Sequence, residues 1–430
     1  MQKTLDNNGE TLIAGAAKED ITPLFPLRLC GFGDREGNFD KVLEPLYIRC
    51  VYLEQKGLKL VLISADILWW GSKLVERIQN EAFSRYSISP DMVLLSATHN
   101  HSGPPTDDHV LDRLESYSPE YADYLFEKAV HVIGLAIQNK QSAKLSRYSG
   151  NCNINVNRRL MVNGKIEMMP NYSAPRDTTL TVLRLENAKG DIIAHMHHYA
   201  CHATVSAENN IQPEYPGIAN RLLDDMFPGS INMFWQGATA DMRPNIVLGD
   251  QFLKLGYDES IAFAKLYVAS IQKALESPSE QLNAELSFKT ETALLPIKPI
   301  EPKEKLIELS KHNSIEGEWA KKVLNDNYPQ FRPCNISLLY LADNCPLLFF
   351  NAELVQSYAR FARELHPSCI TIGYTNGMIG YICSEKEMEE GGYEPYDSHL
   401  WFALPGPYTK ETQKILEGAL SRLSLSTKSQ

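Results

Sequence analysis

The 430-residue sequence lacks the features of a membrane protein and of a disulfide-stabilised one. No stretch approaches the roughly twenty apolar residues that a membrane-spanning helix needs, and residues 1–10 contain no apolar signal-peptide core. The eight cysteines are scattered without Cys-x-x-Cys spacing, so no disulfide framework is indicated. These absences predict a cytoplasmic protein without a transmembrane segment, or a secreted protein if a leader precedes residue 1.

Long basic runs are missing as well. The 42 Lys and Arg residues are outnumbered by 53 Asp and Glu residues, which gives a formal net charge of −11 at pH 7. Nucleic acid and anionic membrane surfaces are therefore poor candidates for a primary partner. What remains, 43% hydrophobic and 22% charged residues, is typical of a globular protein long enough to bury a large core.

Segments with the spacing of strands alternate along the chain with segments that have the spacing of helices. Residues 72–86 are expected to form a helix with Leu74, Ile78 and Phe83 facing inward. Further helices are expected near 217–226, 251–275, 302–324, 354–365 and 411–422, and strands at 59–67, 92–97, 144–148, 180–185, 192–198, 231–235, 336–341, 346–351 and 370–374.

One further helix has a clear start. Ser118 is placed to cap it and Pro119 to occupy its first position, and its apolar stripe extends to about Asn139. The alternation of elements predicts an α/β fold with mixed β-sheets covered by helices. No linker or repeat interrupts it, so we expect a single domain over 1–430, with the weakest boundary near 276–283.

Two segments far apart in the chain place histidines where a metal ion could reach them. The first follows the apolar strand 93–95, and in extended chain the side chains of His99 and His101 would leave on the same side. The second ends at His202, and four of the eleven histidines fall within 195–202. Converging imidazoles can bind zinc or transfer protons. A lone His-x-His also occurs in ordinary polar loops, and one or two of the later four histidines are expected to be strand or core residues.

Four further stretches put polar or ionisable side chains directly after apolar strands, where α/β proteins build sites. They are 14–23 with 31–33, 156–159, 235–245, and 351–353 with 373–381. Together with the Ser-Ala-Thr-His-x-His-Ser-Gly-Pro stretch at 96–104, and in this order, they resemble the catalytic domain of the neutral/alkaline (non-lysosomal) ceramidases. The resemblance spans Ala14 to about Tyr408.

This resemblance implies a zinc amidase of lipid metabolism that cuts the N-acyl bond of a sphingoid base. It carries over His99, His202, Glu353 and Tyr381 as ligands of Zn²⁺. Two imidazoles, a carboxylate and one weak ligand would leave the ion open to water and substrate, as a catalytic site requires. Water at such an ion becomes a nucleophile at neutral pH.

Two further roles follow from the same resemblance. His101 falls beside the metal, where it could transfer a proton to the leaving group. Arg158 falls near the scissile group, where it could stabilise an oxyanion or hold a substrate carboxylate.

Other interpretations of three residues stay open. Glu353 would also suit the amino end of the helix expected at 354–365, without any metal. Tyr381 would also suit the interior of a strand. Asp241 would either support a metal-binding histidine or cap a turn before Pro244.

The chain departs from the family pattern at one position of consequence. The family shows Gly-Asp-x-Ser-Pro-Asn where 240–245 read Ala-Asp-Met-Arg-Pro-Asn, so Arg243 replaces a serine implicated in catalysis. A fixed cation facing the pocket would favour a substrate with a carboxylate, sulfate or phosphate group; pointing away, it would form an ordinary ion pair. The chain also stops near where the family adds a C-terminal β-sandwich domain, so that domain is expected to be absent.

The sequence therefore predicts a zinc-dependent hydrolase that cleaves an amide, or as a second choice an ester, by metal-activated water. Its expected substrate is a soluble small molecule, neutral or anionic, other than a typical ceramide. One alternative is a genuine neutral ceramidase acting on N-acylsphingosine, and another is a non-catalytic metal-binding relative. Nitrogen and oxygen ligands also suit other divalent ions such as manganese and iron.

Overall fold

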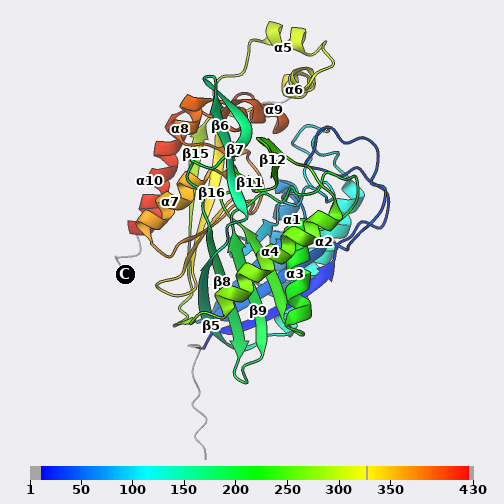
Figure 1. Ribbon diagram of the computed structural model, residues 1–430. Helices are drawn as coiled ribbons and strands as arrows, with labels where there is room; N and C mark the ends of the chain where they lie inside the picture. Colours follow the sequence, from blue (N-terminus) through cyan, green and yellow to red (C-terminus); the bar gives the residue numbers. More distant parts are fainter. Residues whose placement is uncertain (1–10, 326–327, 426–430) are drawn as a thin grey trace, which may run out of the picture.

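The computed structural model describes residues 11–325 and 328–425, and a large mixed β-sheet forms its centre (Figure 1). In these residues the strand order is β10-β9-β8-β5-β1-β2-β3-β4, with β14 paired to β5. Neighbouring strands are antiparallel except for the parallel pairs β3–β4 and β9–β10. The strands are β1 (Ile13–Asp20), β2 (Tyr47–Gln55), β3 (Leu58–Ala65), β4 (Val93–Ala97), β5 (Gln141–Asn151), β8 (Thr179–Asn187), β9 (Ile192–Tyr199), β10 (Ile231–Gln236) and β14 (Glu280–Leu282).

Helices cover one face of this sheet. Parallel neighbours need a crossover connection, and α1 (Ser72–Tyr86) supplies it between β3 and β4, as α3 (Glu214–Met226) does between β9 and β10. With α2 (Pro119–Gln138) and α4 (Tyr257–Leu275), they form the helical layer seen in Figure 1.

A second sheet covers the opposite face. In β2, Cys50 and Tyr52 belong to the core beneath α1 and α2, whereas Val51 and Leu53 pack against the second sheet. This alternation follows from the two-residue period of a strand, and it explains why β2, β3 and β4 are buried along most of their length. The second sheet has the order β15 (Ser287–Pro296), β16 (Phe331–Tyr340), β17 (Pro346–Phe350) and β19 (Ile370–Ile372), and α7 (Gln356–Leu365) and α10 (Glu411–Leu425) pack against it.

The predicted class is thus confirmed: the chain is an α/β protein with mixed sheets covered by helices. Ser118 caps α2 through a hydrogen bond from the Tyr121 amide, and Pro119 occupies the first position. All eight cysteines are free and buried, in agreement with the absence of a disulfide framework. In the described ranges, no helix is long and apolar enough to span a membrane. The single-domain organisation over 1–430 stays a prediction.

Three expectations about helices are wrong in detail. Phe83 is 59% exposed, because Ala82 takes the inward position four residues after Ile78. The helix expected from residue 251 begins at Tyr257, since Gln251–Phe252 (β13) pairs instead with Val247–Leu248 (β12). The helix expected at 302–324 divides into α5 (Lys303–Leu309) and α6 (Ile315–Leu324), because the Ser314 hydroxyl caps a new start by accepting from the Gly317 amide.

A small three-stranded sheet was not foreseen. It has the order β11 (Met242–Pro244), β6 (Asn155–Val162) and β7 (Lys165–Asn171). Met242 pairs with Asn157, which lies 85 positions earlier in the chain, so no local sequence pattern predicts this pairing. This sheet and the helices α5, α6, α8 (Glu385–Glu390) and α9 (Ser398–Trp401) stand at the top of the molecule in Figure 1.

Gly15 provides a test of the packing between β1 and α2. A Cβ atom at this position would lie 2.1 Å from the Ala136 carbonyl oxygen and 2.8 Å from the Lys140 nitrogen. Overpacking of this kind forces the backbone apart, so we expect Gly15→Ala to lower the free energy of unfolding by about 2 kcal/mol in urea titrations. Gly418→Ala in α10 is the control, because the nearest atom lies 3.6 Å away in the Arg422 side chain. Equal stability of the two variants would contradict the close approach.

Candidate metal centre

The two histidine segments meet because the large sheet curls. Although β4 and β10 stand at opposite ends of the strand order, the Ser64 hydroxyl of β3 donates to the Phe234 carbonyl of β10 at 2.6 Å. At the strand ends, the Gln236 side-chain amide donates to the Thr98 carbonyl at 3.2 Å, and an isolated bridge joins Asn100 to Ala203. The curl therefore brings the segment after β4 beside the segment after β9.

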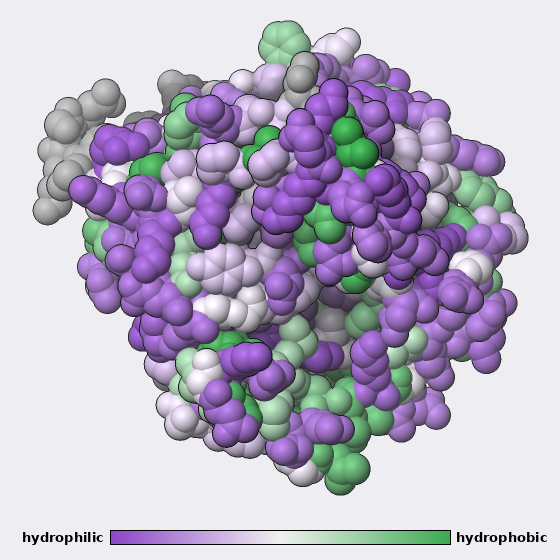
Figure 2. Space-filling model, turned by 90° about the horizontal axis from the view of Figure 1, so that it is seen from above, coloured by the Kyte–Doolittle hydropathy of each residue, from purple (hydrophilic) through white to green (hydrophobic). Residues whose placement is uncertain are grey.

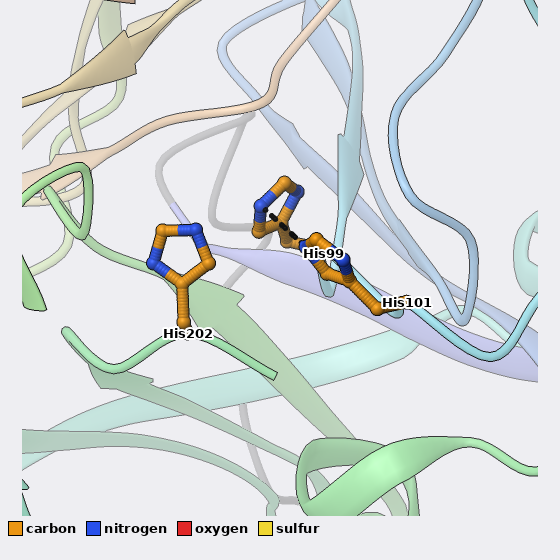
Figure 3. A group of neighbouring side chains, drawn as sticks. All are labelled: His99, His101 and His202. Atoms are coloured by element: carbon orange, nitrogen blue, oxygen red, sulfur yellow. Dashed lines mark hydrogen bonds between the residues drawn. The ribbon is translucent and has the colours of Figure 1, made fainter. Parts of the chain in front are cut away.

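The chain is not extended at the His-x-His pair, contrary to expectation. His99 has a φ of 61°, in the left-handed region, so the backbone turns there. The two imidazoles nevertheless converge, with 3.2 Å between the Nε2 atoms of His99 and His101 (Figure 3). His202 faces the same pair, and the ligand atoms of the three rings lie within 4.8 Å of one another.

Hydrogen bonds at Nδ1 fix the tautomer of each ring. His99 Nδ1 lies 3.1 Å from the Leu68 carbonyl, and His101 Nδ1 lies 3.0 Å from the Gly31 carbonyl. His202 Nδ1 lies 2.8 and 2.9 Å from two carbonyls, those of Thr239 and Met242. A carbonyl can only accept, so each Nδ1 carries the hydrogen and each Nε2 presents a lone pair. Burial lowers the pKa of all three rings, that of His99 to about 3, which keeps them neutral.

Glu353 completes the centre with a carboxylate. Its Oε1 atom lies 3.0 Å from His202 Nε2, and its Oε2 atom lies 3.7 Å from His99 Nε2. Both Glu353 and these two histidines are buried, and within the described residues no hydrogen-bond donor reaches Glu353 Oε1. The lone pairs of His99 and His202 therefore face this carboxylate, and the lone pair of His101 faces that of His99. This arrangement is costly unless a cation joins these atoms.

This donor set fits a metal ion. Imidazole nitrogen and carboxylate oxygen are the ligands that zinc prefers in catalytic sites. Metal-binding histidines usually donate their other ring N–H group to a carbonyl or carboxylate, as the three Nδ1 atoms do here. His99, His101 and His202 thus form a group that could hold a metal ion, with Glu353 beside it.

Tyr381 and Glu353 are brought together by a short parallel pair. Glu353–Leu354 (β18) pairs with Tyr381–Ile382 (β20), and Glu353 stands in register with Tyr381. Glu353 therefore lies in a strand and not in the first turn of a helix, and α7 starts three residues later. Burial raises the pKa of Glu353, and a hydrogen bond with the Tyr381 side chain acts in the opposite direction.

Arg158 lies on the other side of Tyr381 and is held firmly. Its Nη2 donates to the Tyr381 hydroxyl at 3.2 Å and its Nε donates to Glu394 Oε1 at 2.8 Å. The second oxygen of Glu394 accepts from Arg159. Burial acts to raise the pKa of Glu394, but the two guanidinium groups outweigh it and hold the pKa below its usual value.

Among the described residues, no hydrogen bond or ion pair joins Asp241 to the three histidines. Its Oδ1 accepts from the Gln356 amide at the start of α7, and its Oδ2 accepts from the Asn157 side chain, both at 2.9 Å. Burial raises the pKa of Asp241 to about 7. Its carbonyl also accepts from the Arg158 amide at 2.8 Å, so Asp241 fixes the strand that carries Arg158.

Arg243 lies on β11 beside the centre. Its guanidinium carbon stands 4.8 Å from the centre of the Phe252 ring, and its Nη1 atom stands 3.8 Å from the Met168 sulfur. It is close enough to His202 to lower the pKa of that ring. Burial and the positive charge of Arg158 lower the pKa of Arg243 itself to about 10. The ordinary ion pair considered above is not found among the described residues.

The other three histidines of the 195–202 cluster are structural. Their side chains are buried in β9 and each has its own polar partner. His195 contacts Asn232, His197 contacts Asn220 and Tyr267, and His198 contacts the Thr371 carbonyl.

Sequence reasoning gave no role to Tyr374. Its ring stacks on His99, with 4.1 Å between ring centres and 27° between the planes, and its hydroxyl lies 2.5 Å from the Thr239 hydroxyl. The signal available was the Gly-Tyr-Thr-Asn-Gly turn at 373–377, in which Tyr374 adopts a φ of 55°.

Seen from above, the molecule is hollowed near the centre of this face, with many hydrophilic side chains around the hollow (Figure 2). A curled mixed sheet with histidines, a carboxylate and a tyrosine at its strand ends defines an α/β protein with a candidate metal centre.

The family described as "Neutral/alkaline non-lysosomal ceramidase, N-terminal" matches residues 12–253, more than half of the chain. The protein belongs to this family, as its sequence motifs predicted.

Comparisons with individual proteins agree with this assignment. The chain is 27% identical over 216 residues to Neutral ceramidase A of Dictyostelium discoideum, a match that covers 45% of this chain but only 30% of that protein. Its fold superposes on neutral ceramidase from Pseudomonas aeruginosa with a TM-score of 0.78 and 18% identity, covering 97% of this chain and 74% of the other. A ceramidase complexed with C2 gives a TM-score of 0.79 at 17% identity, with 97% and 75% coverage.

Proposed function

We propose that this protein is a zinc-dependent hydrolase that cleaves an amide (N-acyl) bond. The observation that carries the proposal is the convergence of three imidazole lone pairs, one of which lies 3.0 Å from the unsatisfied Oε1 atom of Glu353. His99, His202 and Glu353 would hold the ion, with the Tyr381 hydroxyl as a weaker ligand. Zinc at this centre would polarise a carbonyl group and lower the pKa of water towards neutrality.

His101 is suited to transfer a proton from the attacking water to the leaving group. Its Nε2 atom carries a lone pair at the centre, and its Nδ1 hydrogen is committed to the Gly31 carbonyl. A neutral imidazole in this position can accept a proton from water and deliver it to the departing amine nitrogen. The ring is also only partly buried, whereas His99 and His202 are almost fully enclosed.

Arg158 is suited to stabilise the negative charge that develops on the carbonyl oxygen. Two groups, Glu394 and Tyr381, fix its guanidinium, so its donors need not reorient during the reaction. Asp241 would contribute indirectly, by holding the backbone of Arg158 in place.

Hydrolysis of a panel of N-acyl amines tests this function. We expect zinc-loaded protein to release free amine, and protein treated with a chelator to release none. His101→Ala should retain its zinc and lower kcat by about 100-fold, since general acid–base catalysis contributes on that order. If folded, zinc-loaded protein cleaves no member of a broad panel, a non-catalytic metal-binding role becomes the better explanation.

Family membership favours a second candidate, a genuine ceramidase that hydrolyses N-acylsphingosine. Arg243 is the feature that separates the two, because a partly buried cation beside the centre suits an uncharged ceramide poorly. A fluorescent ceramide assay on the wild-type protein and on Arg243→Ser distinguishes them. Turnover of ceramide by the wild type supports this second candidate, and turnover only by the variant supports the first.

A further inference from the structure

The charges around the candidate metal centre do not balance. Arg158 and Arg159 share the carboxylate of Glu394, and Arg159 also reaches Glu390. Arg243 lies on the same side of the centre, and the groups that act on its charge are Arg158, Tyr381 and Cys201, with no carboxylate among them. Within the described residues, Arg243 is therefore a partly buried cation that forms no ion pair with a carboxylate.

A metal ion would increase this imbalance. A divalent cation adds two positive charges, of which Glu353 neutralises one, and the three neutral imidazoles neutralise none. Together with the partly buried Arg243, the centre would then hold an excess of positive charge, which a bound anion would offset.

We propose that Arg243 binds an anionic group of the substrate close to the scissile bond, and that the substrate class is the N-acyl amino acids. This inference rests on the proposed amidase function. The anion must lie near the reacting atoms because of where β11 holds Arg243. The carbonyl of the preceding residue, Met242, lies 2.9 Å from His202 Nδ1, and Arg243 pairs with Val156, two residues before Arg158. In an N-acyl amino acid the carboxylate is attached to the carbon next to the amide nitrogen, which places it at such a distance.

The surroundings of Arg243 suit this role. Its guanidinium lies over the Phe252 ring and against the Met168 sulfur, so apolar groups orient its plane without using its hydrogen-bond donors on another charge. A planar guanidinium matches the two oxygens of a carboxylate. Met168 is 42% exposed, which leaves an apolar surface beside the cation for the rest of the substrate.

Binding to metal-free protein tests the proposal without catalysis. The probes are N-octanoylglycine and N-octanoylglycinamide, which differ only in the carboxylate, and calorimetry measures each Kd. We expect the wild type to prefer the acid by about tenfold or more, the range of a charge-assisted hydrogen-bonded contact. Arg243→Gln should abolish this preference, and Arg243→Lys should retain part of it because the charge remains. Arg360→Gln is the matched control, since it removes an exposed arginine on α7.

Zinc-loaded protein provides the second measurement, and its outcomes separate this proposal from the amidase function. Faster cleavage of the acid by the wild type, lost in Arg243→Gln, supports both. Cleavage of both probes at equal rates overturns the role of Arg243 and leaves the amidase standing. Absence of cleavage, with the binding preference intact and dependent on Arg243, overturns the amidase and supports the anion site. Two binding results contradict the proposal. One is a preference for the acid that persists in Arg243→Gln, and the other is a wild type that binds the acid and the amide equally well.

Discussion

His202→Ala is expected to abolish stoichiometric zinc binding, whereas the wild type should bind one ion per chain. The substitution removes one of the lone pairs that face Glu353 and leaves the carboxylate with a single imidazole within 3.7 Å. Zinc at 1,000 times its Kd stabilises a folded protein by about 4 kcal/mol, and this gain should disappear with the ion. Elemental analysis after dialysis and thermal unfolding with and without zinc measure both effects.

His195→Ala is the matched control for this experiment. His195 is equally buried and lies on the strand that leads to His202, but it contacts Asn232 and Arg184 instead of the centre. The control should bind one zinc ion and lose stability only through the cavity that it creates. One zinc ion per chain in both His99→Ala and His202→Ala would refute the centre.

Glu353→Gln is expected to change stability in opposite directions with and without zinc. In the metal-free protein the carboxylate is buried against imidazole lone pairs, so an isosteric amide with two hydrogens to donate should raise the free energy of unfolding by about 1–3 kcal/mol. Zinc affinity should fall by at least about 100-fold, the upper range for loss of a supporting group, because an anionic ligand is lost.

Urea titrations at matched protein concentration, with chelator and with excess zinc, measure the two effects of Glu353→Gln. Glu394→Gln is an informative comparison, because Glu394 is paired with Arg158 and Arg159 and its neutralisation should destabilise the protein under both conditions. A Glu353→Gln variant that loses stability without zinc and keeps the full zinc-dependent gain would show that the carboxylate does not serve a metal.

The elements that could be predicted are those with local signals. The cap and proline at Ser118 and Pro119 fixed the start of α2, and apolar runs located β4, β9 and β10. The division of the helix expected at 302–324 was missed because Ser314 competes with the helix as a cap, and propensity alone does not decide between them. The β11-β6-β7 sheet was missed because its pairing is not local.

The same distinction applies to the candidate centre. The proximity of His99, His101, His202 and Glu353 could be predicted, because their motifs follow apolar strands and resemble a known family. Their roles stay predictions. Glu394 could not be paired with Arg158, since 236 positions separate them and only the folded sheet brings them together. The surroundings of Arg243 depend on two hairpins that no sequence pattern places side by side.

The left-handed backbone at His99 and Tyr374 has a consequence for attempts to improve this protein. Non-glycine residues in that conformation cost roughly 1–3 kcal/mol each, so the fold tolerates strain where its two stacked rings meet. Glycine at either position would relax the chain and discard a ring. Laboratory selection for thermal stability alone would therefore favour glycine at these two positions. The resulting proteins would be more stable but would lack a side chain of the candidate metal centre.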